Sequence, residues 1–161
     1  MKLDKERWIK VPTGKVVAEL RESCKEPIKK GFSNYVGFEH IEPENLNLKS
    51  FGDLNDGVTF SKTFKKGDVL FGKIRAYLKK VAVAPIDGIC SGDILVLRTK
   101  DEGTLSQTLL PYYFQTQSFL NKAIGTSIGT TLPRTKWQHL AKHEISIPPH
   151  DDQKRLVSLF D

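Results

Sequence analysis

The sequence predicts a single α+β domain, in which a curved, mostly antiparallel sheet forms a partial barrel and a few helices pack against it. Short β-type segments between Thr59 and Thr99, broken by Gly or Pro, predict the sheet. Helical spacing of apolar residues in segments 108–124 and 150–161 predicts the helices. The chain of 161 residues, 39% hydrophobic and 27% charged, is long enough to bury a core.

The first part of the chain predicts a short helix, a strand and a reversal. Thr13 is expected to cap a helix that carries apolar residues on one side. A strand is expected at 34–38, after a basic turn. The Asp56-Gly57 pair is typical of a hairpin-type reversal.

The remainder predicts the sheet, a long helix, a last strand and a terminal helix. Pro111 suits the first turn of the 108–124 helix, and Gly125 is expected to end it. A last strand at 142–148 stops at two prolines, and acidic residues begin the helix at 150. The expected strands of the sheet are 58–64, 68–74, 79–85 and 88–99.

Positive charge is concentrated in one short window. Segment 62–81 contains seven of the 25 Lys and Arg residues and one of the 19 Asp and Glu residues, so it accounts for the whole net charge of +6. Such an excess favours a polyanionic partner.

No motif predicts an enzyme, a metal site or a membrane protein. The sequence has no Walker loop, no GxGxxG after a strand and no GxSxG elbow. Two isolated cysteines, and His139 and His143 spaced four apart, do not make a metal site. No apolar run reaches the roughly 18–20 residues of a membrane span, and the N-terminus lacks the apolar block of a signal peptide. We therefore expect no catalytic site, no cofactor, no metal, no membrane association and a cytoplasmic location.

Within the basic window, alternation along an expected strand places four side chains on one face: Lys73, Arg75, Tyr77 and Lys79. Such a row suits a phosphate backbone, and an arginine in it can also bind a phosphate bidentately. A lysine-rich edge strand that protects against aggregation explains the row equally well.

A second basic stretch favours the nucleic-acid interpretation. Segment 103–143 contains no Asp or Glu but includes Arg134 and Lys136. Its Gly/Thr-rich loop carries hydroxyls that can donate to phosphates or base edges: Thr126, Ser127, Thr130 and Thr131.

Four segments together carry a family resemblance. GDVLFGKIRAYLKK (67–80), CSGDILVL (90–97), GTTLPR (129–134) and ISIPPHDDQKRLV (145–157) resemble a target-recognition domain of the DNA specificity (S) subunit of type I restriction–modification enzymes. The departures are mild: Ala76 stands where proline is usual, Gly92 follows Cys-Ser, and Asp152 replaces the usual Glu before Gln153.

The resemblance implies a non-catalytic domain that binds double-stranded DNA without a cofactor. Its implied partners are the methyltransferase (M) subunits and, through them, the restriction (R) subunits. Residues 1–149 would form the recognition domain and 150–161 the start of the spacer helix. The chain is expected to be either a half-size subunit that pairs with a copy of itself or a fragment of a longer S subunit with a second recognition domain.

The resemblance also divides the candidate DNA-binding residues into two groups. Residues in or next to the 67–80 motif, together with Lys136, are expected to contact phosphates or brace the fold: Lys66, Lys73, Arg75, Tyr77, Lys79, Lys80 and Lys136. The candidates for reading bases lie in other segments and in the Gly/Thr-rich loop that ends at Arg134: Lys30, Ser33, Asn34, Asn55, Thr126, Ser127, Thr130, Thr131 and Arg134.

Three alternatives stay open at this point. The specificity domain of a single-chain restriction–modification enzyme would be built alike, and only the longer chain would separate the two. An RNA-binding β-module needs exposed aromatic platforms, for which Tyr77 and Trp137 are the candidates. A nuclease or methyltransferase fragment would reveal itself by Mg²⁺-dependent cleavage or by AdoMet binding.

Overall fold

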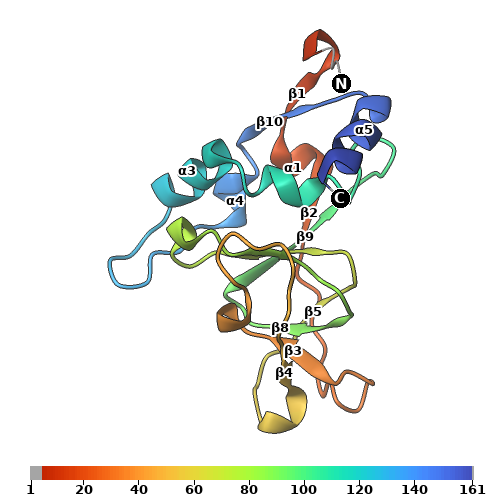
Figure 1. Cartoon of the computed structure of the whole chain (residues 1–161). Coiled ribbons are helices and arrows are strands. Elements are labelled where there is room, and N and C mark those ends of the chain that lie inside the picture. Colours follow the sequence, from red (N-terminus) through yellow and green to blue (C-terminus); the bar gives the residue numbers. More distant parts are fainter. Residues whose placement is uncertain (1–4, 161) are drawn as a thin grey trace.

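The computed structural model describes residues 5–160, in which ten short strands alternate with short helices (Figure 1). The strands are β1 (Ile9–Pro12), β2 (Val17–Leu20), β3 (Asn34–Val36), β4 (Gly52–Asp53), β5 (Lys62–Phe64), β6 (Val69–Gly72), β7 (Val81–Val83), β8 (Gly88–Cys90), β9 (Ile94–Thr99) and β10 (Glu144–Ile147). The α-helices are α1 (Thr13–Val16), α2 (Leu110–Tyr113), α3 (Gln117–Gly125), α4 (Trp137–Leu140) and α5 (His150–Phe160). The 3₁₀ turns are η1 (Lys5–Arg7), η2 (Phe38–His40), η3 (Leu54–Asp56) and η4 (Ala76–Leu78). No helix in this part of the chain is long and apolar enough to cross a membrane.

The strands form three small sheets. One has the order β2-β9-β6-β7, the second β4-β3-β8-β5, and a two-stranded sheet joins β1 to β10. All pairings are antiparallel except that of β3 with β8. The predicted α+β fold with a mostly antiparallel sheet is confirmed, and the sheets do not close into a barrel within residues 5–160.

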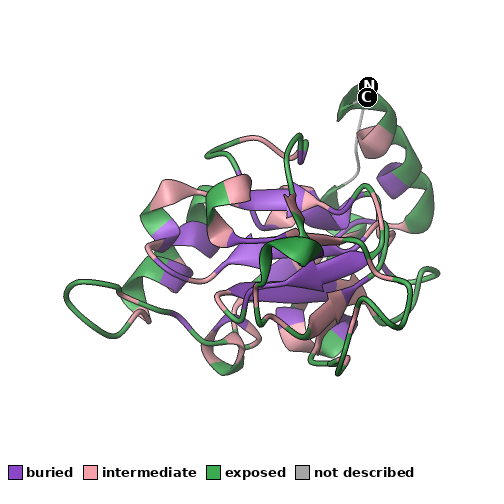
Figure 2. Cartoon of the chain, turned by 90° about the horizontal axis from the view of Figure 1, so that it is seen from below, coloured by how far each residue is buried: buried purple, intermediate pink, exposed green. Residues whose placement is uncertain are grey.

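The central strands β6 and β9 are buried on both faces (Figure 2). Alternate residues of each strand belong to different core clusters, because successive side chains of a strand point to opposite faces. Phe71 and Leu95 lie in the cluster under the helices, whereas Leu70 and Val96 lie in the cluster between the two larger sheets. Figure 1 shows the helices gathered on one side of this sheet and β3, β4, β5 and β8 on the other.

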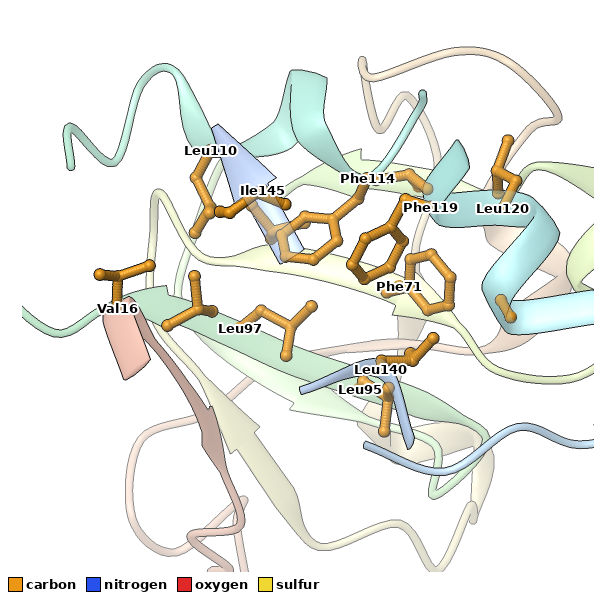
Figure 3. Packing of buried hydrophobic residues seen from close by; sticks show 14 of the residues in the cluster. Val16, Phe71, Leu95, Leu97, Leu110, Phe114, Phe119, Leu120, Leu140 and Ile145 are labelled. Atoms are coloured by element: carbon orange, nitrogen blue, oxygen red, sulfur yellow. The ribbon is translucent and has the colours of Figure 1, made fainter. Parts of the chain in front are cut away.

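Aromatic packing joins the helices to the central sheet. Phe71 of β6 lies 6.0 Å from Phe114 and 5.9 Å from Phe119, measured between ring centroids, in edge-to-face geometry (Figure 3). The rings of Phe114 and Phe119 are 4.6 Å apart. Edge-to-face pairs of this kind add roughly 0.5–1.5 kcal/mol each to the gain from burial.

Two helix predictions are corrected. Thr13 is the first residue of α1 and does not cap it; its buried hydroxyl donates to the carbonyl of His143 at 2.6 Å. The helix ends at Val16, because the chain then pairs with β9 as strand β2. The expected helix 108–124 is divided into α2 and α3, since extended Thr116 interrupts it and accepts a hydrogen bond from the amide of Phe119.

The hairpin expected at Asp56-Gly57 does not form. Gly57 adopts φ 89° and ends η3, a conformation that glycine accepts without steric cost. The strands before and after it pair elsewhere, β4 with β3 and β5 with β8. The Asp-Gly pair therefore ends a 3₁₀ helix and does not close a hairpin, because the strands before and after it pair with other strands.

Two buried polar side chains tie distant segments together. Asp68 accepts two hydrogen bonds from Arg98, at 2.6 and 2.8 Å, and one from the amide of Lys65. Gln153 accepts from the amide of Ser106 and donates to the carbonyls of Thr104 and Pro148. The two contacts hold β6 to β9 and α5 to the loop after β9.

We predict that Asp68→Ala lowers the free energy of unfolding by about 2–3 kcal/mol, measured by urea denaturation. The change leaves the Arg98 guanidinium without its carboxylate, although a third of that side chain is in water. Lys29→Ala breaks an exposed ion pair and should change stability by less than about 0.5 kcal/mol. Equal effects of the two substitutions would contradict the structural importance of Asp68.

Gln153→Ala should destabilise the chain by about 2–4 kcal/mol, because it leaves one amide and two carbonyl groups unsatisfied at buried and partly buried positions. Gln117→Ala is the matched control, since among residues 5–160 that side chain bonds to Asn121 alone, on the exposed side of α3. The urea midpoints of both variants measure the difference. An unchanged midpoint for Gln153→Ala would rule out the bracing role.

Candidate nucleic-acid interface

The expected row of cations on one strand face is wrong. Strand β6 ends at Gly72, and the 3₁₀ turn η4 begins at Ala76. Arg75 and Lys79 flank this turn with positive φ angles of 47° and 56°. Side chains on such a turn do not alternate, so Lys73, Arg75, Tyr77 and Lys79 do not share a face. Buried Ala76 and the hydrogen bond from the Arg75 amide to the Pro133 carbonyl hold the turn in place.

Three of the motif cations brace neighbouring loops. The Arg75 guanidinium donates to the carbonyl of Thr131 at 3.1 Å. The Lys79 ammonium pairs with Glu44 at 3.2 Å. The Lys80 ammonium donates to the carbonyl of Phe38 at 3.0 Å and lies 4.2 Å from the centre of the Phe38 ring.

The Gly/Thr loop is an ordered hairpin, which we call the tip hairpin (residues 128–134). Ile128 and Arg134 exchange two backbone hydrogen bonds, of 2.9 and 3.0 Å, across a turn at Gly129, whose φ is 113°. Arg134 also forms a β-bridge with Ile74, and the amide of Thr135 donates to the carbonyl of Lys73. The segment 67–80, which we call the basic motif segment, is therefore paired with the tip hairpin through backbone hydrogen bonds.

The loop hydroxyls fall into two groups. Thr126 donates to the carbonyl of Lys122 at 2.7 Å, and Ser127 donates to that of Ala123 at 2.6 Å, so both satisfy the end of α3. Thr130 and Thr131 are exposed, and within residues 5–160 neither hydroxyl has a polar partner. The latter pair can therefore contact a ligand without breaking a bond.

Arg134 is the exposed cation of the tip hairpin. Its guanidinium lies 3.3 Å from the carboxylate of Asp93, and about half of the arginine side chain is in water. An exposed pair of this length contributes little to stability, so Arg134 can change partners at low cost. Ile128 and Leu132 are also exposed on the hairpin, at 68% and 41%.

The other base-reading candidates lie elsewhere. Asn34 and Asn55 cluster at the β3–β4 end, where their amides bond to the Gly52 carbonyl and the Asp53 carboxylate. The carbonyl of Ser33 accepts from the amide of Leu54 beside them, and exposed Lys30 lies in the preceding turn. Figure 1 shows this end at the bottom of the view and the loop between α3 and α4, which carries the tip hairpin, at the left. The structure therefore divides the candidates between two places.

Lys73 and Lys136 line one hollow of about 560 Å³, next to Trp137. The hollow also includes Arg21 and Lys62, which were not predicted as site residues. Burial lowers the pKa of the Lys62 ammonium, and the nearby cation of Lys73 acts in the same direction. The sequence near Arg21 carries no motif that would have predicted its position in the hollow. That position depends on strand β2, which ends at Leu20, directly before Arg21. Of the remaining predicted cations, Lys66 is exposed, as is the aromatic side chain of Tyr77.

His, Cys, Asp and Glu side chains are not clustered as metal ligands in the part of the chain that the structure describes. No group of three or more His, Cys, Asp or Glu side chains is placed to hold a metal ion there. Burial raises the pKa of the Cys90 thiol to about 12, so this cysteine is not a reactive nucleophile. Burial and the charge of Lys122 lower the pKa of His143.

Comparison with known proteins tests the family resemblance directly. The family model described as type I restriction modification DNA specificity domain matches residues 9–161. The type I restriction enzyme EcoDI specificity subunit of Escherichia coli is 29% identical over 143 residues, which make up 88% of this chain and 31% of that protein.

Solved structures agree with the sequence match. The crystal structure of the HsdS subunit from Thermoanaerobacter tengcongensis superposes with a TM-score of 0.80 at 26% identity, covering 99% of this chain and 42% of that one. A chain solved in work on complex assembly and conformational transition of the type I R-M system gives 0.79 at 25% identity, with coverages of 99% and 42%. This chain thus spans between about a third and two fifths of the length of these relatives, and it belongs to the family of type I restriction modification DNA specificity domains.

Proposed function

We propose that this chain binds a short sequence of duplex DNA as the target-recognition domain of a type I specificity subunit. The observation that carries the proposal is the family match over residues 9–161. The concentration of the net positive charge in one window supports a polyanionic partner independently of that match. The domain itself would perform no chemistry.

The tip hairpin is the proposed reader of base edges. Its backbone hydrogen bonds with the basic motif segment restrain it, so less ordering entropy would be lost on binding than for an unpaired loop. Arg134 can bind the O6 and N7 atoms of guanine bidentately once it leaves Asp93. Ile128 and Leu132 offer apolar surface for a thymine methyl group, and Thr130 and Thr131 offer free hydroxyls.

The motif cations are proposed to hold the DNA backbone or to support the hairpin. Lys73, Lys136 and Lys66 have ammonium groups without a polar partner among residues 5–160, so they can bind phosphates. Arg75, whose guanidinium is bonded to the Thr131 carbonyl, would act by holding the hairpin. Lys79 and Lys80 would brace the loops around η4 in the same way, which leaves Tyr77 as an exposed contact.

The proposed partners beyond DNA are the methyltransferase subunits and, through them, the restriction subunits. Helix α5 would be the start of the spacer helix that leads to them, with residues 1–149 as the recognition domain. Because the chain spans 31% of its Escherichia coli relative and 42% of the Thermoanaerobacter one, a second recognition domain or a second copy would supply the other half-site.

We predict that selection from a random duplex library at low salt enriches one motif of a few base pairs. Low salt is needed because a single domain that contacts roughly 4–6 phosphates binds weakly when counterions compete. Sequencing of the retained DNA measures the result. Retained DNA with no enriched motif would contradict sequence recognition, and preference for single-stranded RNA over duplex DNA would favour an RNA-binding module.

We further predict that Arg134→Ala relaxes discrimination at one position of that motif by about 1–3 kcal/mol, while affinity for unrelated DNA changes little. Competition binding with single-base variants of the selected site measures this. Lys15→Ala removes the same charge from an exposed position of α1 and should leave discrimination unchanged. If Arg134→Ala weakens binding to every sequence alike, Arg134 contacts the backbone and not a base.

A further inference from the structure

The hollow next to Trp137, which we call the basic hollow, is a strongly charged concave surface in the described part of the chain. Four cationic side chains line it, with one carboxylate: Arg21, Lys62, Lys73, Lys136 and Glu19. Its volume of about 560 Å³ is large for a phosphate group and small for a folded partner. Cations in this number around one concavity raise the local concentration of anions.

Backbone hydrogen bonds fix the positions of these cations, which come from four separate segments. Residue 23, just past Arg21, forms a β-bridge with Lys62. Lys62 is also held in register opposite Cys90. The carbonyl of Lys73 accepts from the amide of Thr135, the residue before Lys136. The four charges are therefore brought together by the fold, and not by a flexible tail.

The charges of the hollow are not fully neutralised within the protein. The Arg21 guanidinium pairs with Glu19 at 2.8 Å, and the Lys62 ammonium donates to the Ile94 carbonyl at 2.7 Å. Among residues 5–160, the ammonium groups of Lys73 and Lys136 have no hydrogen-bond or ion-pair partner. Desolvation of Lys62 without a carboxylate of its own is unfavourable, and a bound anion would offset it.

The hollow lies beside the proposed reader. Gly92 lines it, and the next residue, Asp93, contacts Arg134 of the tip hairpin. A second hollow of about 350 Å³ shares Arg21, Lys62 and Gly92 with the first, so the two hollows form one longer concave surface. The second hollow adds Glu22 and no further cation, so the cationic part of this surface is the basic hollow itself.

We propose that this hollow seats a backbone phosphate of the bound DNA, with Lys73 and Lys136 as its direct partners and Arg21 and Lys62 as the supporting charges. The inference rests on the proposed function and adds to it a phosphate position that sets the register of the tip hairpin. Phosphate contacts fix the position of a protein on the duplex, whereas base contacts supply the sequence information.

The first test measures binding of a fluorescent duplex of about 20 base pairs and mixed sequence against salt concentration. The double variant Lys73→Gln/Lys136→Gln should lower the slope of log K against log salt by about 0.9, the value of one neutralised phosphate. Its binding should be roughly tenfold weaker at about 0.05 M salt and should converge with that of the unchanged chain near 1 M. Lys15→Gln, beyond the opposite end of β2 from Arg21, is the control for loss of an exposed lysine and should change neither value.

A second pair of variants tests the hollow without removing a cation. A side chain can be added at Gly92, because a Cβ there has no atom within 4 Å. Gly92→Glu should weaken binding more than Gly92→Gln, and the difference should disappear at high salt, which screens the added charge. Equal binding by the Glu and Gln variants, with an unchanged salt slope in the double lysine variant, would overturn the phosphate site.

A short phosphodiester separates failure of this inference from failure of the proposed function. Thymidylyl-thymidine, followed by NMR, should shift the amide signals of Lys73 and Gly92 in the unchanged chain and much less in Gly92→Glu. If duplex binds but the hollow variants bind it equally well, the phosphate site is wrong and the function stands. If the dinucleotide binds in the hollow but no duplex is retained at any salt concentration, the proposed function is wrong and an anion site stands. Absence of both signals overturns both.

Discussion

The pairing of β6 with β9 is the constraint on which the rest of this domain depends. Both strands are buried on both faces, so a shift of one residue in their register would exchange the side chains of the two core clusters. The register therefore fixes where β6 ends and where β9 begins. Lys73 directly follows the last residue of β6, and Asp93 directly precedes the first residue of β9. The amide of Lys73 donates to the carbonyl of Asp93. The candidate interface therefore lies at one end of the β6–β9 strand pair.

Buried polar groups then hold the outer parts to this centre. Asp68 connects the start of β6 to Arg98 of β9, and Gln153 connects α5 to the loop that follows β9. Buried groups of this kind are costly without partners, and each is satisfied by several hydrogen bonds. The glutamine that follows the paired prolines in the family motif therefore has a structural explanation in this chain. It orients the helix that continues toward the C-terminus.

The basic residues divide by whether the protein itself uses their charge. Arg75, Lys79 and Lys80 are bonded to carbonyl or carboxylate oxygens of neighbouring loops. Lys73 and Lys136 face a hollow and have no such partner among the described residues. This division replaces the simple picture of one cationic strand face: part of the charge supports the tip hairpin, and part is available to a ligand.

The sequence by itself determined the fold class, the central strand β6, the last strand, the terminal helix and the family. These depend on apolar periodicity and on motif order, which are local properties of the chain. It did not show that the expected strand 88–99 is divided into β8 and β9, which belong to different sheets. It did not determine the turn at 76–78, because the amide of Arg75, which has a left-handed conformation, donates to the carbonyl of Pro133, far outside any short window. Nor did it place Arg21 and Lys136 around one hollow, since the two are 115 positions apart in the chain and are brought there by the tertiary fold. Charge and motif predicted a DNA-binding domain, and only the tertiary structure decided which cations are left free to bind.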